Sequence, residues 1–212
     1  MTQQAQRSVV AITGGMGSGK SSVAAYLCEI GGAMGLSADA LCRQLLEPEA
    51  AGWLTVRKAF GGRFFLADQH IDRPLLRKVL FEDHEFRREL NALLHPLVRN
   101  EITSCIEKEM GHLSQAEAQV QSQVRFVVEV PLLYEAHWEQ DFPRIVVAYA
   151  DTKACRRRIM LRDRISEAEA EKAIATQMSL PHKALLADHV IDNSGPWSDT
   201  CLQIRHLRNL LW

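Results

Sequence analysis

Short, almost continuously apolar runs alternate along this chain with longer segments of helical periodicity. Five such runs have the length of strands and few polar positions, which is typical of parallel strands covered on both faces. A chain that alternates such strands with helices predicts an α/β fold around a parallel sheet. The predicted strands are residues 8–13, 33–37, 124–130, 144–149 and 189–192.

Two of the intervals between strands are longer than a single crossover requires. Residues 49–123 have a mostly helical pattern, interrupted at 61–62, Pro74 and His95-Pro96, and their last stretch, 111–123, predicts an exposed helix or loop. Residues 152–187 predict a second helical insertion with a break near 179–181. One domain is therefore expected, with a core at about 1–48, 124–151 and 188–212 that includes helices at 20–30 and 198–211.

A glycine-rich stretch joins the first predicted strand to the first predicted helix. Residues 14–21 fit the pattern G-x-x-x-x-G-K-S/T, with Gly19, Lys20 and Ser21 at its end. Glycines let successive backbone N–H groups turn toward a phosphate chain, Lys20 would reach the β/γ-phosphates, and the Ser21 hydroxyl would bind Mg²⁺. The helix that follows points its positive dipole end at the anion. Because the strand and helix come in the required order, we prefer this phosphate-binding loop (P-loop) to a plain turn between core elements.

Two carboxylates follow predicted strands, where ligands of open parallel sheets bind. Asp39 comes after the second strand and could take a hydroxyl proton during phosphoryl transfer, or it could merely cap the next helix, a role that Ser37 could also fill. Glu129 ends the third strand, just before Pro131. A carboxylate there is costly unless it is paired, hydrogen-bonded or near a metal, so Glu129 is a candidate for the magnesium shell or for orienting Lys20. The alternative is a structural acid that pairs with a buried base.

Basic residues concentrate in the two insertions. Six fall within residues 153–164, where Arg158 and Arg162 would share a helix face and repel each other unless an anion neutralised them. A solvated charged face is the alternative, and it is favoured for most of these arginines. In the first insertion, His95 before Pro96 is typical of a helix start or a turn.

Composition limits the possible functions. The 212 residues carry 25 basic and 26 acidic side chains, so no global field attracts nucleic acid or a membrane surface. Residues 1–7 are polar and lack the apolar core of a signal peptide, and no apolar run reaches the length of a membrane span. Five scattered cysteines and eight histidines without metal-site spacing favour a cytoplasmic protein with neither a disulfide framework nor a structural zinc site.

Together these stretches resemble the dephospho-CoA kinase family along nearly the whole chain. The P-loop is shared by many families, whereas the stretches at 129–135 and 190–195, in register with His95-Pro96, are far more specific. The residues that carry the resemblance are 13–21, 38–39 with Arg43, 46–48, 60–61, 72–73, 94–96 with Arg99, 129–135, 162–163, 175–178, Lys183 and 187–195.

The resemblance implies a P-loop nucleoside-kinase-like core with a five-stranded parallel sheet, an inserted helical CoA domain at about 49–123 and a helical lid at about 152–187. It further implies transfer of the ATP γ-phosphate to the 3′-hydroxyl of dephospho-CoA with Mg²⁺, the last step of coenzyme A synthesis. Asp39 matches the family's proposed base and Arg162 its lid arginine, which would act beside Lys20. The implied nucleotide residues are Gly15, Met16, Gly17, Ser18, Gly19, Lys20, Ser21, Ser22, Asn193 and Gly195, the metal residues are Ser21 and Glu129, and the acceptor residues are Arg43, His95, Arg99 and Leu132.

Three positions depart from the family pattern. Ser37 replaces an acid that usually stands two residues before the base, Arg164 replaces a glycine after the lid Arg-Asp pair, and Ala173 replaces an arginine of the lid helix. None of these changes removes a central catalytic group, so an active enzyme with an altered lid is expected. The alternatives are a related kinase with another acceptor and a non-catalytic nucleotide-binding module, which the absence of guanine-reading and switch motifs disfavours.

Overall fold

The computed structural model describes residues 9–116 and 124–212, and it contains one five-stranded parallel sheet. The sheet confirms the fold class expected from the apolar runs, and each strand lies within the range predicted for it, apart from the last residue of β1. Ser8, the first residue of one predicted strand, lies outside the described residues. The strands are β1 (Val9–Gly14), β2 (Met34–Ser37), β3 (Phe126–Glu129), β4 (Ile145–Tyr149) and β5 (His189–Asp192).

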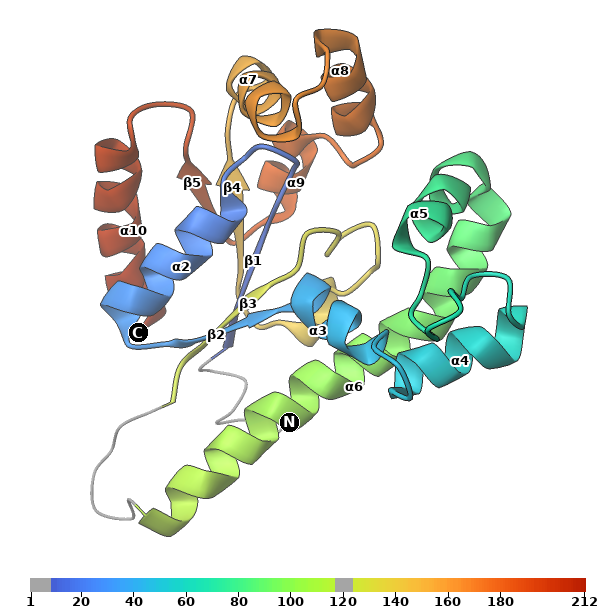
Figure 1. Cartoon of the computed structure of the whole chain (residues 1–212). Coiled ribbons are helices and arrows are strands. Elements are labelled where there is room, and N and C mark those ends of the chain that lie inside the picture. Colours follow the sequence, from blue (N-terminus) through green and yellow to red (C-terminus); the bar gives the residue numbers. More distant parts are fainter. Residues whose placement is uncertain (1–8, 117–123) are drawn as a thin grey trace. The chain divides into compact units, whose positions relative to one another are not determined.

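The strand order, β2-β3-β1-β4-β5, puts β1 at the centre of the sheet (Figure 1). Its neighbours β3 and β4 come later in the chain, so the connections diverge from β1, and such a switch point forms a crevice at the carboxyl ends of the strands. The register aligns Glu129 of β3 with both Ile12 of β1 and Ser37 of β2. The P-loop and Glu129 therefore meet at this edge of the sheet.

The chain divides into two compact units, Met1–Ser37 with Glu107–Trp212, and Ala38–Ile106. We call them the sheet unit and the helical unit. The division into a core, an acceptor domain and a lid with separate functions stays a prediction. The helices of the sheet unit are α2 (Lys20–Gly31), α7 (Thr152–Asp163), α8 (Glu167–Ala175), α9 (Leu180–Leu186) and α10 (Trp197–Leu211), with a 3-10 turn, η1 (Glu139–Asp141).

Helices α2 and α10 lie side by side against one face of the sheet (Figure 1). Both have the apolar stripe that the periodicity predicted, and each buried aliphatic side chain in it contributes about 1.5–3 kcal/mol to the hydrophobic stabilisation. The stripe is completed by alternate residues of the strands, as the pleat requires. The helices and strands together form one buried apolar cluster, which includes Val10, Ile12, Val23, Leu27, Val127, Val146, Ala148, Ile191, Ile204, Leu207 and Leu211.

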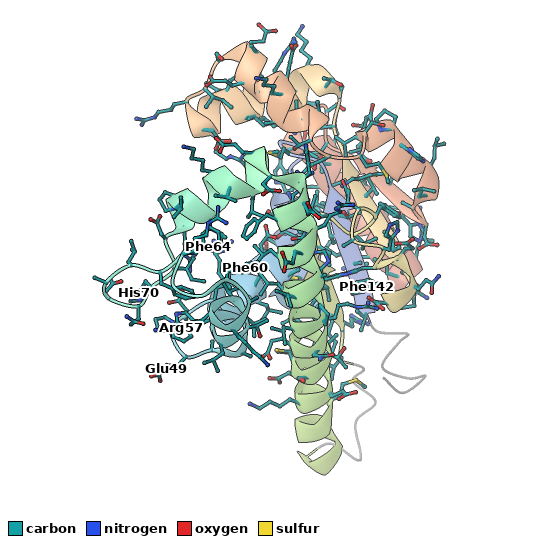
Figure 2. All side chains as sticks on the ribbon, turned by 90° about the vertical axis from the view of Figure 1, so that its right-hand side faces the viewer. Glu49, Arg57, Phe60, Phe64, His70 and Phe142 are labelled. Carbon is teal, nitrogen blue, oxygen red and sulfur yellow. The ribbon has the colours of Figure 1, made fainter. Side chains whose placement is uncertain are left out.

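The helical unit has its own aromatic core. It comprises α3 (Ala38–Leu45), α4 (Ala51–Phe60), α5 (Arg73–Glu82) and the first part of α6 (His84–Ala116). The rings of Phe60, Phe64 and Phe86 pack together with centroids 4.9 to 6.0 Å apart, and Figure 2 labels the first two. The predicted break at residues 61–62 separates α4 from the following turn. Pro74 lies in the first turn of α5, whose cap is Asp72.

The predicted break at His95-Pro96 is wrong, because α6 runs through it without interruption. Proline in a helix interior removes one N–H and costs about 3 kcal/mol. Here the cost is offset by an apolar stripe that continues on both sides of Pro96 and is buried along its length. The stripe consists of Leu90, Leu94, Val98, Ile102 and Ile106. Residues 111–116 of the predicted polar segment belong to α6, and residues 117–123 lie outside the described residues.

The second insertion is helical, as predicted, but it has two breaks. One separates α7 from α8 at residues 164–166, and the other separates α8 from α9 at 176–179, close to the predicted position. Arg164 ends α7 in the left-handed conformation, with φ +55°, which favours glycine over residues with a Cβ. Ser166 and Glu169 form a capping box at the start of α8. No helix within the described ranges is long and apolar enough to cross a membrane.

Candidate active site

The P-loop connects β1 to α2 through two glycines in the left-handed region. Gly17 has φ +75° and Gly19 has φ +85°. A Cβ at Gly17 would lie 2.5 Å from the carbonyl oxygen of Cys155 on α7, so this position also has no room for a side chain. Helix α2 begins at Lys20, and the N–H groups of its first turn have no partners within the helix. The loop thus presents the positive end of α2 at the edge of the sheet.

A cleft of about 220 Å³ opens beside the second half of this loop. Its charged side chains are Lys20, Arg158 and Arg162, and none of the acidic residues that the structure describes lines it. Three cations around a helix N-terminus favour a polyanion such as a nucleotide phosphate chain. The structure therefore brings Lys20, Ser21 and Arg162 to one cleft, together with Arg158, for which the sequence alone favours a solvated face. The other lining residues are Gly17, Gly19 and Ser22.

Arg158 is that additional residue, and it is held in place by two carbonyl groups. Its guanidinium donates to the carbonyl oxygen of Gly17 at 3.2 Å and to that of Asn193 at 2.7 Å. One side chain of α7 thereby joins the P-loop to the segment after β5. The four-residue spacing to Arg162 signalled a shared face, but it could not show that the face turns toward the P-loop.

Arg162 lies one turn further along α7, and its side chain is 62 % exposed. Its guanidinium pairs with the carboxylate of the adjacent Asp163 through two contacts of 2.7 and 2.8 Å. This hydrogen-bonded partner raises the pKa of Arg162, so its charge is secure. An exposed and neutralised arginine at the cleft wall can exchange Asp163 for a phosphate with little cost in desolvation.

Asn193 has an almost fully buried side chain, with 5 % exposure. Its Nδ2 donates to the carbonyl oxygen of Ser18 at 2.8 Å, while its Oδ1 accepts from the Thr200 hydroxyl at 3.1 Å. The side chain is therefore used to hold the P-loop. Gly195, two residues later, is exposed and does not line the cleft.

The Ser21 hydroxyl donates to Glu129 Oε1 at 2.6 Å. This pair provides one hydroxyl on the cleft wall and one carboxylate behind it, a donor set that suits Mg²⁺, which keeps several waters and uses few protein ligands. Within the described ranges, no three His, Cys, Asp or Glu side chains gather so that they could hold a metal ion by themselves.

The first half of the P-loop faces a second, smaller cavity of about 80 Å³. Gly15 and Met16 line it, with mostly apolar residues of α7, α8 and α9 around them. The backbone N–H of Met16 donates to Gln177 Oε1 at 3.0 Å. The two predicted nucleotide residues therefore have protein partners on this side, whereas Ser18 is buried within the loop.

Of the remaining predicted site residues, four belong to the helical unit and one to the sheet unit. Asp39 and Arg43 belong to α3 of the helical unit, where the Arg43 guanidinium donates to the Asp39 carbonyl at 3.2 Å. Because α3 begins at Ala38, Asp39 lies in its first turn and is not the cap residue. The Asp39 carboxylate is exposed and follows the last residue of β2 by two positions.

His95 and Arg99 lie one turn apart on α6, in the helical unit. Burial, and to a lesser degree the charge of Arg99, lowers the pKa of His95. At neutral pH His95 is therefore an uncharged imidazole inside a helix, in contrast to the predicted helix start. Leu132 belongs to the sheet unit, in the turn after β3, and is 41 % exposed.

Comparison with known proteins identifies the family of this chain. The family model described as dephospho-CoA kinase matches residues 8–199. A dephospho-CoA kinase of Oceanobacillus iheyensis is 36 % identical over 197 residues, which are 92 % of this chain and 94 % of that protein. The chain belongs to the dephospho-CoA kinase family.

Other relatives and solved structures extend the likeness. A dephospho-CoA kinase domain-containing protein of Danio rerio is 36 % identical over 96 % of this chain and 85 % of that protein. A crystal structure from Thermus thermophilus has a TM-score of 0.75 at 28 % identity, with 96 % of this chain and 97 % of that one covered. The fold is also that of a dephospho-CoA kinase from Campylobacter jejuni, with a TM-score of 0.60, 22 % identity and the same coverage.

Proposed function

We propose that this protein transfers the γ-phosphate of ATP to the 3′-hydroxyl of the dephospho-CoA ribose, giving coenzyme A and ADP. The observation that carries the proposal is the cleft in which Lys20 and two arginines of α7 surround the P-loop, in a member of the dephospho-CoA kinase family. Phosphoryl transfer needs little covalent chemistry from the protein, because positioning and charge stabilisation supply most of the rate. The P-loop backbone of this cleft can position the phosphates, and its three cationic side chains can stabilise their charge.

The nucleotide residues have distinct tasks in this proposal. The P-loop amides and Lys20 hold the β- and γ-phosphates, and Arg158 and Arg162 stabilise the charge that spreads over the transferred group. Ser21 and Glu129 would hold Mg²⁺, which supplies a positive charge to the phosphate oxygens. Gln177 and Asn193 keep the loop itself in shape, as their hydrogen bonds indicate.

The acceptor residues come from the helical unit and from the turn after β3. Asp39 would take the proton of the 3′-hydroxyl as the phosphoryl group arrives, a task that suits an exposed carboxylate after a strand of the core. Arg43 and Arg99 would bind the acceptor's phosphates, while the neutral His95 would donate or accept a hydrogen bond. Leu132 would contact the apolar part of the acceptor.

We also propose a cytoplasmic location, with no nucleic acid or membrane surface as partner. The support is the balance of 25 basic and 26 acidic residues, and the five cysteines, all described, which form no disulfide.

A single assay tests the proposed function. ADP release is measured with dephospho-CoA, AMP, adenosine, pantetheine or no acceptor, and the product is identified by mass spectrometry. Of the acceptors tested with ATP, we expect only dephospho-CoA to cause rapid ADP release, with coenzyme A as the second product. ADP release that does not depend on dephospho-CoA would contradict the proposal, and rapid release with AMP or adenosine would support a related nucleoside kinase instead.

A further inference from the structure

A buried ion pair lies next to the P-loop and is not used by the proposed chemistry. Lys183 of α9 has a fully buried side chain, and its Nζ is 3.0 Å from Oε1 of Glu135, in the segment after β3. Burial lowers the pKa of this lysine, and the Glu135 carboxylate opposes that shift. Burying a lysine in this way costs free energy that a plain helix–loop contact would not require, so the pair needs an explanation.

The ion pair is the centre of a network that reaches the P-loop at two points. Lys183 Nζ also donates to the carbonyl oxygen of Pro131 at 3.0 Å, and this oxygen accepts the Thr13 hydroxyl at 3.3 Å. Glu135 Oε1 accepts the backbone N–H of Met178 at 2.9 Å. Thr13 is the residue of β1 that precedes the P-loop, so this arm fixes the entry of the loop.

The second arm passes through the connection between α8 and α9. Met178 is bonded to Glu135, and its neighbour Gln177 accepts the backbone N–H of Met16. Leu180 closes the gap beside Gly15, because a Cβ on that glycine would lie 3.1 Å from the leucine Cγ. The network therefore holds the chain at residue 13, directly before the loop, and at residue 16 within its first half.

We infer that Gln177, Glu135 and Lys183 are positioning residues for the nucleotide site, an inference that rests on the proposed function. They fix the first half of the P-loop and attach the start of α9 to it. Residues 17–21 then present their backbone amides, Lys20 and Ser21 to the phosphates without a further ordering cost. A misplacement of this loop by an ångström would weaken several phosphate contacts together, whereas the fold would remain.

The test measures kcat, the KM for ATP and the thermal midpoint of each variant, and the Kd for ATP without any acceptor. Gln177→Ala removes the acceptor of the Met16 N–H at a partly buried position. We expect the KM and the Kd for ATP to rise about tenfold and kcat to fall about tenfold, with a thermal midpoint close to that of the unaltered protein. Glu171→Gln, which breaks an exposed ion pair between α7 and α8, is the matched control and should leave all four quantities unchanged.

The ion pair is tested with a double variant, because single changes also damage the fold. Lys183→Met leaves the Glu135 carboxylate without its buried partner and should lower the thermal midpoint. Glu135→Gln combined with Lys183→Met removes both charges and should restore much of the midpoint. Lys183→Met alone should raise the Kd for ATP about tenfold, and the double variant should keep that rise, because the carbonyl oxygen of Pro131 still lacks its lysine donor.

The outcomes separate this inference from the proposed function. If the double variant regains the ATP affinity along with the thermal midpoint, the pair is only structural and the inference is wrong. If Gln177→Ala leaves the Kd for ATP and kcat unaltered, the hydrogen bond from Met16 to Gln177 does not position the P-loop, and that part of the inference is wrong. If the unaltered protein does not phosphorylate dephospho-CoA, the proposed function fails, while the Kd for ATP still decides the inference.

Discussion

The two units hold their candidate residues in different ways. In the sheet unit, side chains far apart in the sequence are tied to the P-loop: Asn193 to Ser18 and Arg158 to Gly17. In the helical unit, the Arg43 guanidinium bonds one turn back to the Asp39 carbonyl, and the buried core beneath is aromatic and aliphatic. A site fixed by long-range hydrogen bonds is preorganised for its ligand, whereas the Arg43–Asp39 contact stays within one helix.

The largest effect should come from Asp39, the one residue of the helical unit that the proposal places in the chemical step. Asp39→Asn removes the proton acceptor but keeps the size of the side chain. We expect kcat to fall by about 10²–10⁴-fold, while the Kd for ATP changes little. Steady-state kinetics and nucleotide titration measure the two quantities. Near-normal turnover in Asp39→Asn would remove Asp39 as the base and leave the chemistry to the sheet unit.

A second prediction compares three arginines of α7. Arg158→Ala removes two hydrogen bonds that hold the P-loop and the segment after β5, and Arg162→Ala removes a charge from the cleft. Each change should lower kcat/KM for ATP by about 10–100-fold or more, because charge-assisted hydrogen bonds contribute about 1.5–3 kcal/mol. Arg157→Ala, which alters an exposed arginine of the same helix, is the control. Equal, small effects in all three variants would mean that Arg158 and Arg162 contribute no more to the nucleotide site than a solvent-exposed arginine does.

The acceptor side is tested by Arg99→Ala. If Arg99 binds a phosphate of dephospho-CoA, its loss should raise the KM for dephospho-CoA about tenfold and leave the KM for ATP unchanged. Arg88→Ala removes another exposed arginine from α6 and should change neither constant. A parallel rise in both KM values would mean that the two units do not divide the ligands as proposed.

A smaller effect is expected at Arg164, which ends α7 with φ +55°. Glycine adopts this conformation without the steric cost that a Cβ imposes, so Arg164→Gly should stabilise the protein by about 0.5–1 kcal/mol. In a chain of this length, the thermal midpoint rises by about 2–4 °C for each kcal/mol of added stability. Arg157→Gly, inside the same helix, should have the opposite sign. A lower midpoint in Arg164→Gly would mean that the arginine side chain supplies a compensating contact.

The smallest effect concerns the pH dependence of stability in the helical unit. Burial lowers the pKa of His95, so the unfolded chain takes up this proton at a higher pH than the folded one. Protonation of His95 therefore favours the unfolded state, and the free energy of unfolding decreases as the pH falls through 6.5 and below. His95→Gln should show a shallower loss of the free energy of unfolding between pH 7 and 5, measured by urea denaturation. Exposed His206→Gln is the control, and an unchanged slope in His95→Gln would contradict the prediction.

Much of the fold followed from residue pattern, because the driving interactions are local or periodic. The five strands, α2 and α10 were predicted from apolar runs and from stripes such as that of Ile204, Leu207 and Leu211. The continuity of α6 through Pro96 was not predicted, because local propensity marks a break there. Tertiary burial on both sides of the proline decides otherwise.

The nucleotide site was predicted in part, for a similar reason. The P-loop is a local pattern, so Lys20 and Ser21 could be recognised in the sequence. The roles of Arg158, Gln177 and Lys183 depend on contacts between segments that are 35 to 161 residues apart. No periodicity encodes such contacts. Arg43 and Arg99 rest on family resemblance, and Asp39 on its place after a strand together with that resemblance, so their roles stay predictions.

The unbroken course of α6 has a practical consequence for dissecting this protein. The helix has 33 residues and is about 50 Å long at 1.5 Å per residue. Its residues up to Ile106 belong to the helical unit, and those from Glu107 onward belong to the sheet unit. A fragment limited to residues 38–106 would end inside α6, ten residues before the last residue of the helix, where Ile102 and Ile106 are buried. Domain exchange among relatives should therefore transfer α6 whole, with the splice placed after its last turn.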